Sequence, residues 1–591
     1  MRILSRSILL LSVIFYTQVA SAAFRQPLRN KKEMVVSAHP LASDAGLEML
    51  RKGGNAIDAA VATTFAISVV EPFSAGIGGG GFLLMHDSRK RTIKALDFRE
   101  RAPLKATKNM YLDDNGKVRR NASINGYLAV GTPGTVAGMY EVHRRYGKLP
   151  WKKVVEPSIK LAKDGFVVSD KFVQALRRRK RMIATNQPAR AIFTRNGNYY
   201  QPGEKLVQKD LGKTLQDIAE LPQSFYTGKI ARAIASDMEK NGGLITLEDL
   251  KSYKPIWREP VCGNFRQARV CSMPPPSSGG IHLLQMLNII GDTDLKSLGW
   301  HHPDAIHLIA EAMRISYADR SEYLGDPDFV KVPQQQLINP EYAKLRRQQI
   351  NMQRANPSTQ VKPVSKETLQ KFSPKPSSTL IPANPKPELI PANPKSKEST
   401  ETSHLTVIDE QLNAVSLTFT INLGFGAGVV TPGTGIVLNN EMDDFSAAPG
   451  VPNAFGLVGN EANSISPLKT PLSSMTPTIV TENGRLRMAV GTPGGSTIIT
   501  QVLQIILNVL EYDMDAAAAV SASRIHHQWL PDTLRVEPWG LDALTLQELK
   551  RRGHKIRQTN PWGNSNLIIV KPDGTLEGAA DSRGEGEARG I

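Results

Sequence analysis

The chain has 591 residues, of which 40% are hydrophobic and 47 are glycine. This composition is typical of a large folded body and excludes an intrinsically disordered chain. The formal charge of +18 could indicate a nucleic-acid-binding protein. However, the only dense basic run is RRRKR at 177–181, which ends a helix predicted to begin near Ser169 and has no interleaved aromatic residues. We therefore interpret it as a solvated helix face and expect no nucleic-acid partner.

The N-terminus has the three parts of a secretory signal peptide. Arg2 and Arg6 form a basic region, residues 8–16 are largely apolar, and Ala20-Ser21-Ala22 fits the A-x-A cleavage pattern. The apolar core is too short to span a bilayer, and no later stretch reaches that length. We predict a signal peptide at 1–22, cleaved after about Ala22, and a soluble periplasmic or secreted protein without a membrane span.

Two early segments predict a helix followed by a close turn. Residues 56–70 (AIDAAVATTFAISVV) predict a buried helix, and the glycine-rich run at 76–81 predicts a tight turn from this helix into a strand. The run does not follow a strand as a dinucleotide-binding loop does, so we interpret it as close backbone packing.

The cysteines and histidines indicate a structural bridge rather than a metal site. Cys262 and Cys271 lie in two short predicted strands around a turn, and in an oxidising compartment a disulfide is favoured over two free thiols. Two cysteines do not make a zinc site, and the adjacent His526 and His527 cannot share one helical face. We expect neither a metal nor a cofactor.

A flexible linker is predicted from about 356 to 401. It is rich in Pro, Lys and Ser, and its nonapeptide LIPANPKPE (380–388) is nearly repeated at 389–397. The segment that follows, TSHLTVIDEQLNAVSLTFTINLGFG (402–426), predicts two alternating strands with a turn at 410–413. Thr402 thus stands at the head of a strand, directly after the linker.

A threonine in this position fits an N-terminal nucleophile. Cleavage of the Glu401–Thr402 bond would give Thr402 a free α-amine beside its own hydroxyl. An α-amine has a pKa near ~8, so it is partly neutral at working pH and can accept the hydroxyl proton. The alternative is that Thr402 only satisfies a turn, as most Ser and Thr residues at strand starts do.

Groups suited to acyl transfer gather in the last third of the chain. They are the carboxylates Glu441, Asp443 and Asp444, the hydroxyls of Ser473 and Ser474, and a strand–turn–helix pattern at 489–510. Its PGGS turn presents consecutive backbone N–H groups that can bind an anion. Each feature also has a structural explanation, as surface carboxylates, a capping pair or a tight turn.

Long ordered segments resemble the bacterial gamma-glutamyltransferases. They are LDFRERAP (96–103), SMPPPSSGG (272–280), TSHLTVID from 402, LNNEMDDFSAAPGVPN (438–453), PLSSMTPTIV (471–480), GTPGGS (491–496) and RIHHQWLPD (524–532). The resemblance implies an N-terminal-nucleophile fold of the α+β class, a four-layer αββα sandwich. It also implies self-cleavage into a large subunit, 23–401, and a small catalytic subunit, 402–591, which stay intertwined as a heterodimer. The expected activity is transfer of the γ-glutamyl group of glutathione or related compounds to water, amino acids or peptides.

The resemblance also implies a role for each site residue. Thr402 matches the nucleophile, Thr420 the hydroxyl that orients it, and Gly494 and Gly495 the oxyanion-hole amides. Arg99 matches the arginine that binds the substrate α-carboxylate, as a bidentate fork suits that group. The other matching binding residues are Ser473 and Ser474 for the α-carboxylate, and Asn422, Glu441 and Asp444 for the α-ammonium.

Two positions depart from the family pattern. Some members have Gln at the Glu441 position, so the site here is expected to carry one more negative charge. A Tyr often stands at the Phe455 position in the lid loop, SAAPGVPNAFGLVG (446–459), and Phe cannot donate its hydrogen bond. Two other interpretations are a cephalosporin-acylase-like amidase of the same fold, which Arg99 with Glu441 and Asp444 disfavours, and a catalytically inactive binding protein, which an intact nucleophile set disfavours.

Overall fold

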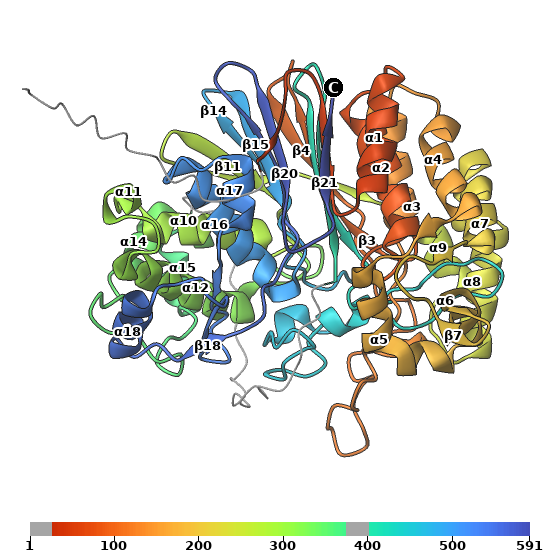
Figure 1. Ribbon diagram of the computed structural model, residues 1–591. Coiled ribbons are helices and arrows are strands. Elements are labelled where there is room, and N and C mark those ends of the chain that lie inside the picture. The colour runs from red at the N-terminus through yellow and green to blue at the C-terminus, as the bar shows by residue number, and fades with distance from the viewer. Residues whose placement is uncertain (1–25, 374–400) are drawn as a thin grey trace, which may run out of the picture.

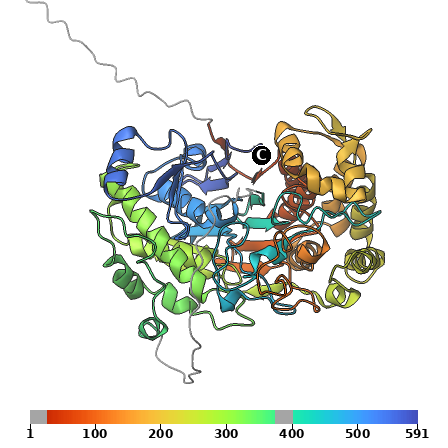
Figure 2. The same cartoon turned by 90° about the horizontal axis from the view of Figure 1, so that it is seen from below.

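The computed structural model describes residues 26–373 and 401–591, and two seven-stranded sheets face each other at its centre. One group of helices covers the outer face of each sheet, which gives four layers in the order helix, sheet, sheet, helix (Figures 1 and 2). This arrangement confirms the predicted αββα sandwich of the α+β class.

Neighbouring strands in both sheets are antiparallel. The first sheet has the order β1 (Leu28–Asn30), β20 (Leu576–Ala580), β19 (Asn566–Val570), β15 (Arg485–Gly491), β14 (Thr478–Glu482), β11 (Ala268–Ser272), β10 (Val261–Phe265). The second has the order β21 (Glu587–Gly590), β2 (Met34–Ser37), β12 (Ser403–Ile408), β13 (Ala414–Thr420), β3 (Gly80–Asp87), β4 (Thr92–Asp97), β9 (Ile256–Arg258). Each sheet therefore combines strands from both sides of the Glu401–Thr402 bond.

The helices divide between the two outer faces (Figure 1). Beside the second sheet lie α1 (Pro40–Arg51), α2 (Ala56–Val70), α3 (Thr135–Tyr146), α4 (Trp151–Asp164), α5 (Asp170–Thr185), α6 (Gln187–Phe193), α7 (Lys209–Glu220), α8 (Lys229–Lys240) and α9 (Leu247–Ser252). Beside the first lie α10 (Gly279–Ile290), α11 (Leu295–Leu298), α12 (Pro303–Tyr323), α13 (Gln334–Leu337), α14 (Pro340–Arg347), α15 (Lys366–Gln370), α16 (Ile498–Leu510), α17 (Ala516–Ser521) and α18 (Ala543–Arg551). The shorter strands pair as β5 (Phe166–Val167) with β8 (Lys205–Leu206), β6 (Thr194–Arg195) with β7 (Asn198–Tyr199), and β16 (Ile525–His526), β17 (Leu534–Val536) and β18 (Ile556–Gln558) together.

Strand alternation explains how the layers pack. Successive side chains of a strand point to opposite faces, so a strand buried on both faces is apolar throughout. In β3, Leu83 packs with the helices around α2, whereas Phe82 and Leu84 belong to the core between the sheets. The same division holds in β15, where Met488 packs toward α16 and Ala489 faces the second sheet.

The helix predicted at 56–70 is confirmed as α2, with every residue buried. Asn55 caps its N-terminus in a capping box with Asp58. The glycine run after it also forms the predicted close turn, because a Cβ at Gly79 would overlap the backbone oxygen of Thr420. This close approach fits the end of β13 tightly against the glycine turn.

Cys262 and Cys271 are paired across the β10–β11 hairpin and form the disulfide that the sequence favoured. The bridge closes a hairpin at the edge of the first sheet, far along the chain from the predicted catalytic residues. Because it links two adjacent strands and neither cysteine is a predicted site residue, we interpret it as a structural bridge.

The first part of the predicted linker is folded, which corrects its boundary. Residues 366–370 form α15, Leu369 is buried with Tyr342, and Ser358 donates a hydrogen bond to Asp532 at 2.8 Å. The prediction relied on the high proline and lysine content of the segment. A few apolar residues are nevertheless enough to pack it against the rest of the protein. The rest of the predicted linker, 374–400, and the predicted signal peptide lie outside the described residues.

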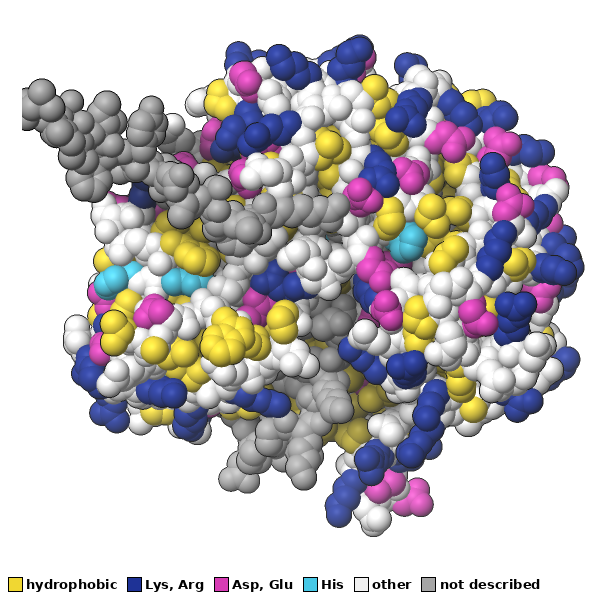
Figure 3. Space-filling view, in the orientation of Figure 1, with side chains coloured by type: hydrophobic (Ala, Val, Ile, Leu, Met, Phe, Trp, Pro, Cys, Tyr) yellow, Lys and Arg dark blue, Asp and Glu magenta, His cyan; other side chains and the backbone are white. Residues whose placement is uncertain are grey.

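The distribution of charged side chains on the surface tests how the basic composition was interpreted. On the face shown in Figure 3, lysine and arginine side chains are spread over most of the surface and interspersed with acidic ones, and several of them follow the projection at the bottom of the view. Across 26–373 and 401–591, no helix is both long and apolar enough to cross a membrane.

Candidate active site

Thr402 lies directly before β12, at the centre of the second sheet, and its hydroxyl contacts two groups. Its Oγ1 is 2.6 Å from the carbonyl oxygen of Glu401 and 3.1 Å from Oγ1 of Thr420, the last residue of β13. The Thr420 oxygen also accepts a hydrogen bond from the backbone N–H of Asn422 at 2.8 Å. One proton arrangement satisfies all three contacts: Thr402 donates to Glu401, and Thr420 donates to Thr402. The two hydroxyls predicted to act together are therefore in hydrogen-bond contact.

Charged side chains surround the Glu401–Thr402 bond. The carboxylate of Glu401 is buried and 3.5 Å from Arg178, and burial raises its pKa although Lys171 and Arg178 oppose this shift. Lys171 itself pairs with Glu71 at 2.8 Å, and Glu71 also accepts a 3.3 Å hydrogen bond from Ser403. The bond predicted to be cut thus lies in a polar, largely buried environment.

A second cluster joins Arg99 with two carboxylates from far along the chain. The Arg99 guanidinium contacts Glu441 at 2.6 Å and Asp444 at 2.5 Å, and its Nε donates to the carbonyl of Pro471 at 2.8 Å. All of its side-chain donor nitrogens are used, and the side chain is 1% exposed. The resemblance assigned these charges to opposite ends of a substrate head group, and in this structure they pair with one another.

Burial controls the protonation of the carboxyl groups in this cluster. Burial raises the pKa of Glu441 to about 7, although Arg99 opposes the shift. Burial and the neighbouring Glu441 raise the pKa of Glu100 well above its usual value, against the opposing effect of Arg99. Burial also raises the pKa of Asp444, against the opposing effect of Arg99 and Arg320.

The two serines lie next to this cluster, and an arginine that the sequence analysis missed accompanies them. Ser473 donates its backbone N–H to Pro276 at 2.9 Å, which fixes the segment beside the start of α10. The Ser474 hydroxyl lies 3.4 Å from Nη2 of Arg320, a residue of α12 whose Nε donates to Ser278 at 3.0 Å. Arg320 is buried and acts electrostatically on Asp444, so the site holds two arginines rather than one.

The glycine turn has the predicted form, a tight connection from β15 into α16. Gly494 and Gly495 have φ angles of 136° and 55°, which favour glycine over other residues. The ring of Phe455, in the lid loop, lies against Gly495, where a Cβ would overlap it. Side chains hold the backbone of Phe455 in place, because its N–H donates to Oδ1 of Asn453 at 3.0 Å and its carbonyl accepts from Nε2 of Gln528 at 3.1 Å.

Contacts connect the groups into one site. The amide of Asn422 donates to the carbonyl of Asn440 at 2.9 Å, which joins the Thr420 loop to the segment carrying Glu441. On the other side, Asn453 lies 3.4 Å from Asp444 and begins the lid turn that packs on Gly495. The structure thus joins the ten predicted residues, directly or through lid and loop residues, in one region.

The basic run at 177–181 is only partly the solvated face that the sequence predicted. Arg179 is partly buried, and its guanidinium donates to the carbonyls of Gly424 at 2.9 Å and Gly426 at 3.0 Å, in the loop after β13. Its position continues the buried stripe of α5 through Phe172, Leu176 and Ile183. That helical spacing was the signal that could have identified it.

One described group has the spacing of a metal site, namely His307, Glu311 and His554. These side chains already have partners within the protein: Nδ1 of His307 is 2.8 Å from Nε2 of His554, and Glu311 forms an ion pair with Arg314. We assign no metal to it.

Comparison with known proteins places this geometry in a family. The sequence model of the gamma-glutamyltranspeptidase family matches residues 42–591. The chain belongs to this family. The glutathione hydrolase proenzyme of Escherichia coli strain K12 is 46% identical over 559 residues, which cover 94% of this chain and 91% of that protein.

Solved structures agree with the fold. The gamma-glutamyltranspeptidase of Helicobacter pylori is 46% identical, with a TM-score of 0.55, over 58% of this chain and 97% of that one. The cephalosporin acylase of Bacillus halodurans is 29% identical, with a TM-score of 0.81, over 98% of this chain and 99% of that one. The family predicted from the sequence is confirmed, and so is the N-terminal-nucleophile sandwich.

Proposed function

We propose that this protein is a self-processing gamma-glutamyltransferase that also hydrolyses glutathione and related γ-glutamyl compounds. The observation that carries the proposal is the pairing of Thr402 with Thr420 beside a buried Arg99–Glu441–Asp444 cluster. The first pair supplies a nucleophile, and the cluster supplies both charges that complement an α-amino-acid head group. Family membership and the name of the Escherichia coli relative agree with it.

Processing begins with the hydroxyl already next to its target. Thr402 Oγ1 attacks the carbonyl carbon of Glu401, the C–N bond breaks, and the nitrogen takes the proton to become the α-amine of Thr402. Water then hydrolyses the resulting ester, which restores the hydroxyl and leaves a new carboxylate on Glu401. Arg178 and Lys171 already act electrostatically on the side-chain carboxylate of Glu401, and their positive charges would also favour the negative charge that this step creates on the same residue.

Turnover uses the same hydroxyl on an external amide. Substrate binds with its α-carboxylate at Arg99, Ser473 and Ser474 and its α-ammonium at Glu441, Asp444 and Asn422. The Thr402 hydroxyl loses its proton to its own α-amine and attacks the γ-carbonyl carbon, while the N–H groups of Gly494 and Gly495 bind the oxyanion. Collapse of this intermediate expels the amine product with the proton, and water or an acceptor amine then attacks the ester.

The deciding experiment measures hydrolysis of γ-glutamyl-p-nitroanilide by the purified protein, with and without glycylglycine as acceptor. We expect nitroaniline release that increases with the acceptor and is abolished in Thr402→Ala. An inactive wild-type protein that is fully cleaved and folded would refute the proposed activity.

The acylase fold relative makes a second substrate informative. A glutaryl amide keeps the terminal carboxylate of a γ-glutamyl amide but lacks the α-ammonium. Because Glu441 and Asp444 are both buried at the head-group cluster, the γ-glutamyl amide should be preferred by at least about tenfold, the value of one charge-assisted hydrogen bond. Equal rates would instead favour an acylase that ignores the ammonium.

The partners and location follow from the same proposal. The products of processing, 23–401 and 402–591, remain a heterodimer because strands from both parts pair with one another in each sheet, as β11 does with β14 and β2 with β12. The N-terminal signal peptide directs the chain to the periplasm or the medium. Cell fractionation with mass measurement of both subunits checks these two statements.

A further inference from the structure

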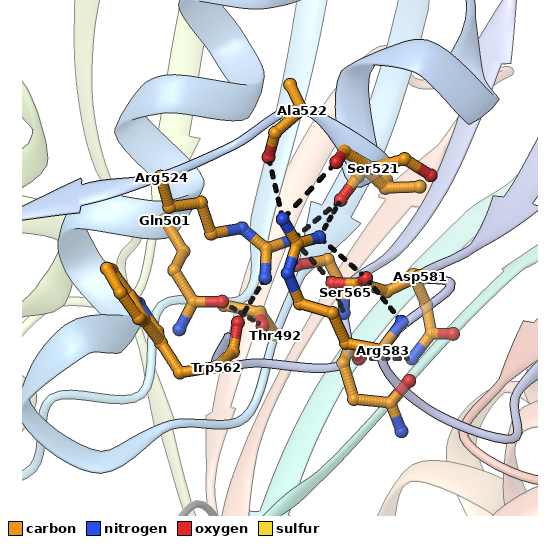
Figure 4. A network of polar contacts seen from close by, with 12 residues as sticks. Thr492, Gln501, Ser521, Ala522, Arg524, Trp562, Ser565, Asp581 and Arg583 are labelled. Atoms are coloured by element: carbon orange, nitrogen blue, oxygen red, sulfur yellow. Dashed lines mark hydrogen bonds and ion pairs between the residues drawn. The ribbon is translucent and has the colours of Figure 1, made fainter. Parts of the chain in front are cut away.

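Gln501 is a fully buried amide in the first turns of α16, and it faces back onto the glycine turn (Figure 4). Its Oε1 accepts a hydrogen bond from the hydroxyl of Thr492 at 3.0 Å. Its Nε2 donates to the carbonyl of Pro493 at 3.0 Å and to the hydroxyl oxygen of Thr497 at 2.9 Å. The carboxamide thus contacts both ends of the turn, and both of its amide protons are used.

These contacts determine the direction of the two N–H groups assigned to the oxyanion. A trans peptide is planar, so its C=O and N–H point in opposite directions. The Pro493 carbonyl belongs to the same peptide as the Gly494 N–H, and Gln501 holds that carbonyl directly. The Gly494 carbonyl belongs to the same peptide as the Gly495 N–H, and it accepts from Thr497 Oγ1 at 2.8 Å and from Thr497 N–H at 3.0 Å. Gln501 therefore orients the first donor directly and the second through Thr497.

Gly563 and Arg524 lie close to the side-chain amide of Gln501 and limit the space around it. Gly563 lies so close that a Cβ there would overlap Oε1 of Gln501 and Nη1 of Arg524. Arg524 donates to the carbonyl of Trp562 and to that of Val520, the latter at 2.6 Å, and pairs with the buried Asp581 (Figure 4). Burial disfavours the Asp581 charge, but Arg524 and Arg583 outweigh it and hold the pKa of Asp581 below its usual range. A rigid network thus backs Gln501.

We propose that Gln501 is a positioning residue for the oxyanion turn, which deepens the proposed function and rests on it. It touches no reacting atom. Its carboxamide fixes two consecutive peptide planes so that both N–H groups point at the same place before the substrate arrives, and donors that are already oriented stabilise a developing charge most effectively.

The test variant is Gln501→Met, which keeps the length of the side chain and removes every hydrogen bond. We expect kcat for γ-glutamyl-p-nitroanilide to fall about tenfold, less than the roughly 10²–10³-fold loss on removing a donor outright, because both N–H groups remain. KM should change by less than about twofold, since the head-group contacts are untouched. Rates are normalised to the amount of cleaved protein.

Binding of a tetrahedral probe separates positioning from general loss of structure. A glutamate analogue whose side chain ends in a boronic acid forms an anionic tetrahedral adduct with a hydroxyl. Its inhibition constant should rise by the same factor as kcat falls, whereas glutamate should inhibit Gln501→Met and wild type equally.

Two further variants act as comparison and control. Thr497→Val removes the relay hydroxyl and should repeat the pattern, and the double variant should lose less than the product of the two effects because both act on one turn. Gln504→Met is the matched control: Gln504 lies one turn farther along α16, and its amide holds Ile525 at 2.8 Å instead of the turn. It should leave kcat and probe binding unchanged.

The outcomes separate the inference from the function. If wild type is active while Gln501→Met and Thr497→Val keep their kcat and probe affinity, Gln501 does not position the turn and the inference is wrong. If Gln501→Met weakens glutamate and probe alike, its effect is structural and the inference is also wrong. Inactivity of the wild type would refute the proposed function instead.

Discussion

Replacing Arg99 with lysine tests the head-group cluster directly. The guanidinium makes three side-chain hydrogen bonds, to Glu441, Asp444 and the carbonyl of Pro471. Lysine keeps the charge, but its single ammonium cannot reproduce a planar fork that contacts groups in three directions. We expect kcat/KM for glutathione to fall while cleavage of the Glu401–Thr402 bond proceeds, because processing involves no free α-carboxylate.

The size of the effect follows from the hydrogen bonds that lysine cannot make. A hydrogen bond to a charged group contributes about 1.5–3 kcal/mol net, and a factor of ten corresponds to about 1.4 kcal/mol. Without one arm of the fork to the substrate carboxylate, kcat/KM should therefore fall roughly 10- to 100-fold. The free energy of unfolding should fall by a similar amount, about 1.5–3 kcal/mol, because one of the two buried carboxylates loses its hydrogen bond while the lysine ammonium keeps the compensating charge.

The assay follows cysteinylglycine release from glutathione, with the extent of cleavage measured on the same sample by mass spectrometry. Arg101→Lys is the matched control, because Arg101 lies two residues away but donates to Lys254 and stacks over Tyr253 instead of joining the cluster. It should leave kcat/KM unchanged. A change of less than about threefold in Arg99→Lys would show that Arg99 is structural, and another cation, with Arg320 the nearest candidate, would have to bind the carboxylate.

Three further results are expected. The small subunit should begin with the sequence TSHLT, and Thr402→Ala should remain one chain; any other N-terminus contradicts cleavage after Glu401. Because the pKa of Glu441 is about 7, the ionised fraction of this group falls about tenfold from pH 8 to pH 6. The ratio of kcat/KM for the γ-glutamyl amide to kcat/KM for the glutaryl amide should therefore fall over the same range, and Glu441→Gln should make this ratio nearly independent of pH. Phe455→Tyr should change KM for the acceptor and the ratio of transfer to hydrolysis without affecting cleavage, provided the added hydroxyl finds a partner; identical kinetics would show that the hydroxyl is irrelevant.

Local patterns in the sequence predicted the elements that lie next to Thr402. The alternating runs after residue 402 became β12 and β13, and the apolar run at 56–70 became α2. These predictions succeeded because strand alternation and helix periodicity depend on neighbours within one element. Arg99 was identified only through the family resemblance, since nothing in its own surroundings distinguishes it from a structural residue. Ser473 and Gly494 were local candidates, as a hydroxyl and as part of an anion-binding turn, but their specific roles came from the resemblance.

Long-range contacts account for what the sequence could not predict. Arg99 pairs with Glu441 across 342 positions, and no local pattern specifies such a contact. Arg320 and Gln501 lie on helices whose apolar periodicity suggests only packing, and their polar ends are explained by groups elsewhere in the chain. The folded start of the linker shows the opposite error, in which composition outweighed a few apolar residues such as Leu369.

The charges of the head-group cluster explain why an amino-acid substrate suits it. With Glu441 ionised, the two arginines Arg99 and Arg320 balance Glu441 and Asp444, so the cluster is close to neutral and its charges compensate one another. A zwitterionic head group adds one positive and one negative charge. The arginine and the carboxylates of the cluster can then exchange their ion pairs with one another for ion pairs with the substrate, and no buried charge is left uncompensated.

A ligand that carries only the carboxylate separates Arg99 from its partners and leaves a buried carboxylate unpaired, at a cost of about 3–5 kcal/mol if nothing replaces the cation. Protonation of Glu441 near its pKa of about 7 relieves that cost, so discrimination against such ligands should weaken as the pH falls. Specificity for the ammonium therefore depends on the charge balance of the whole cluster and not on one contact.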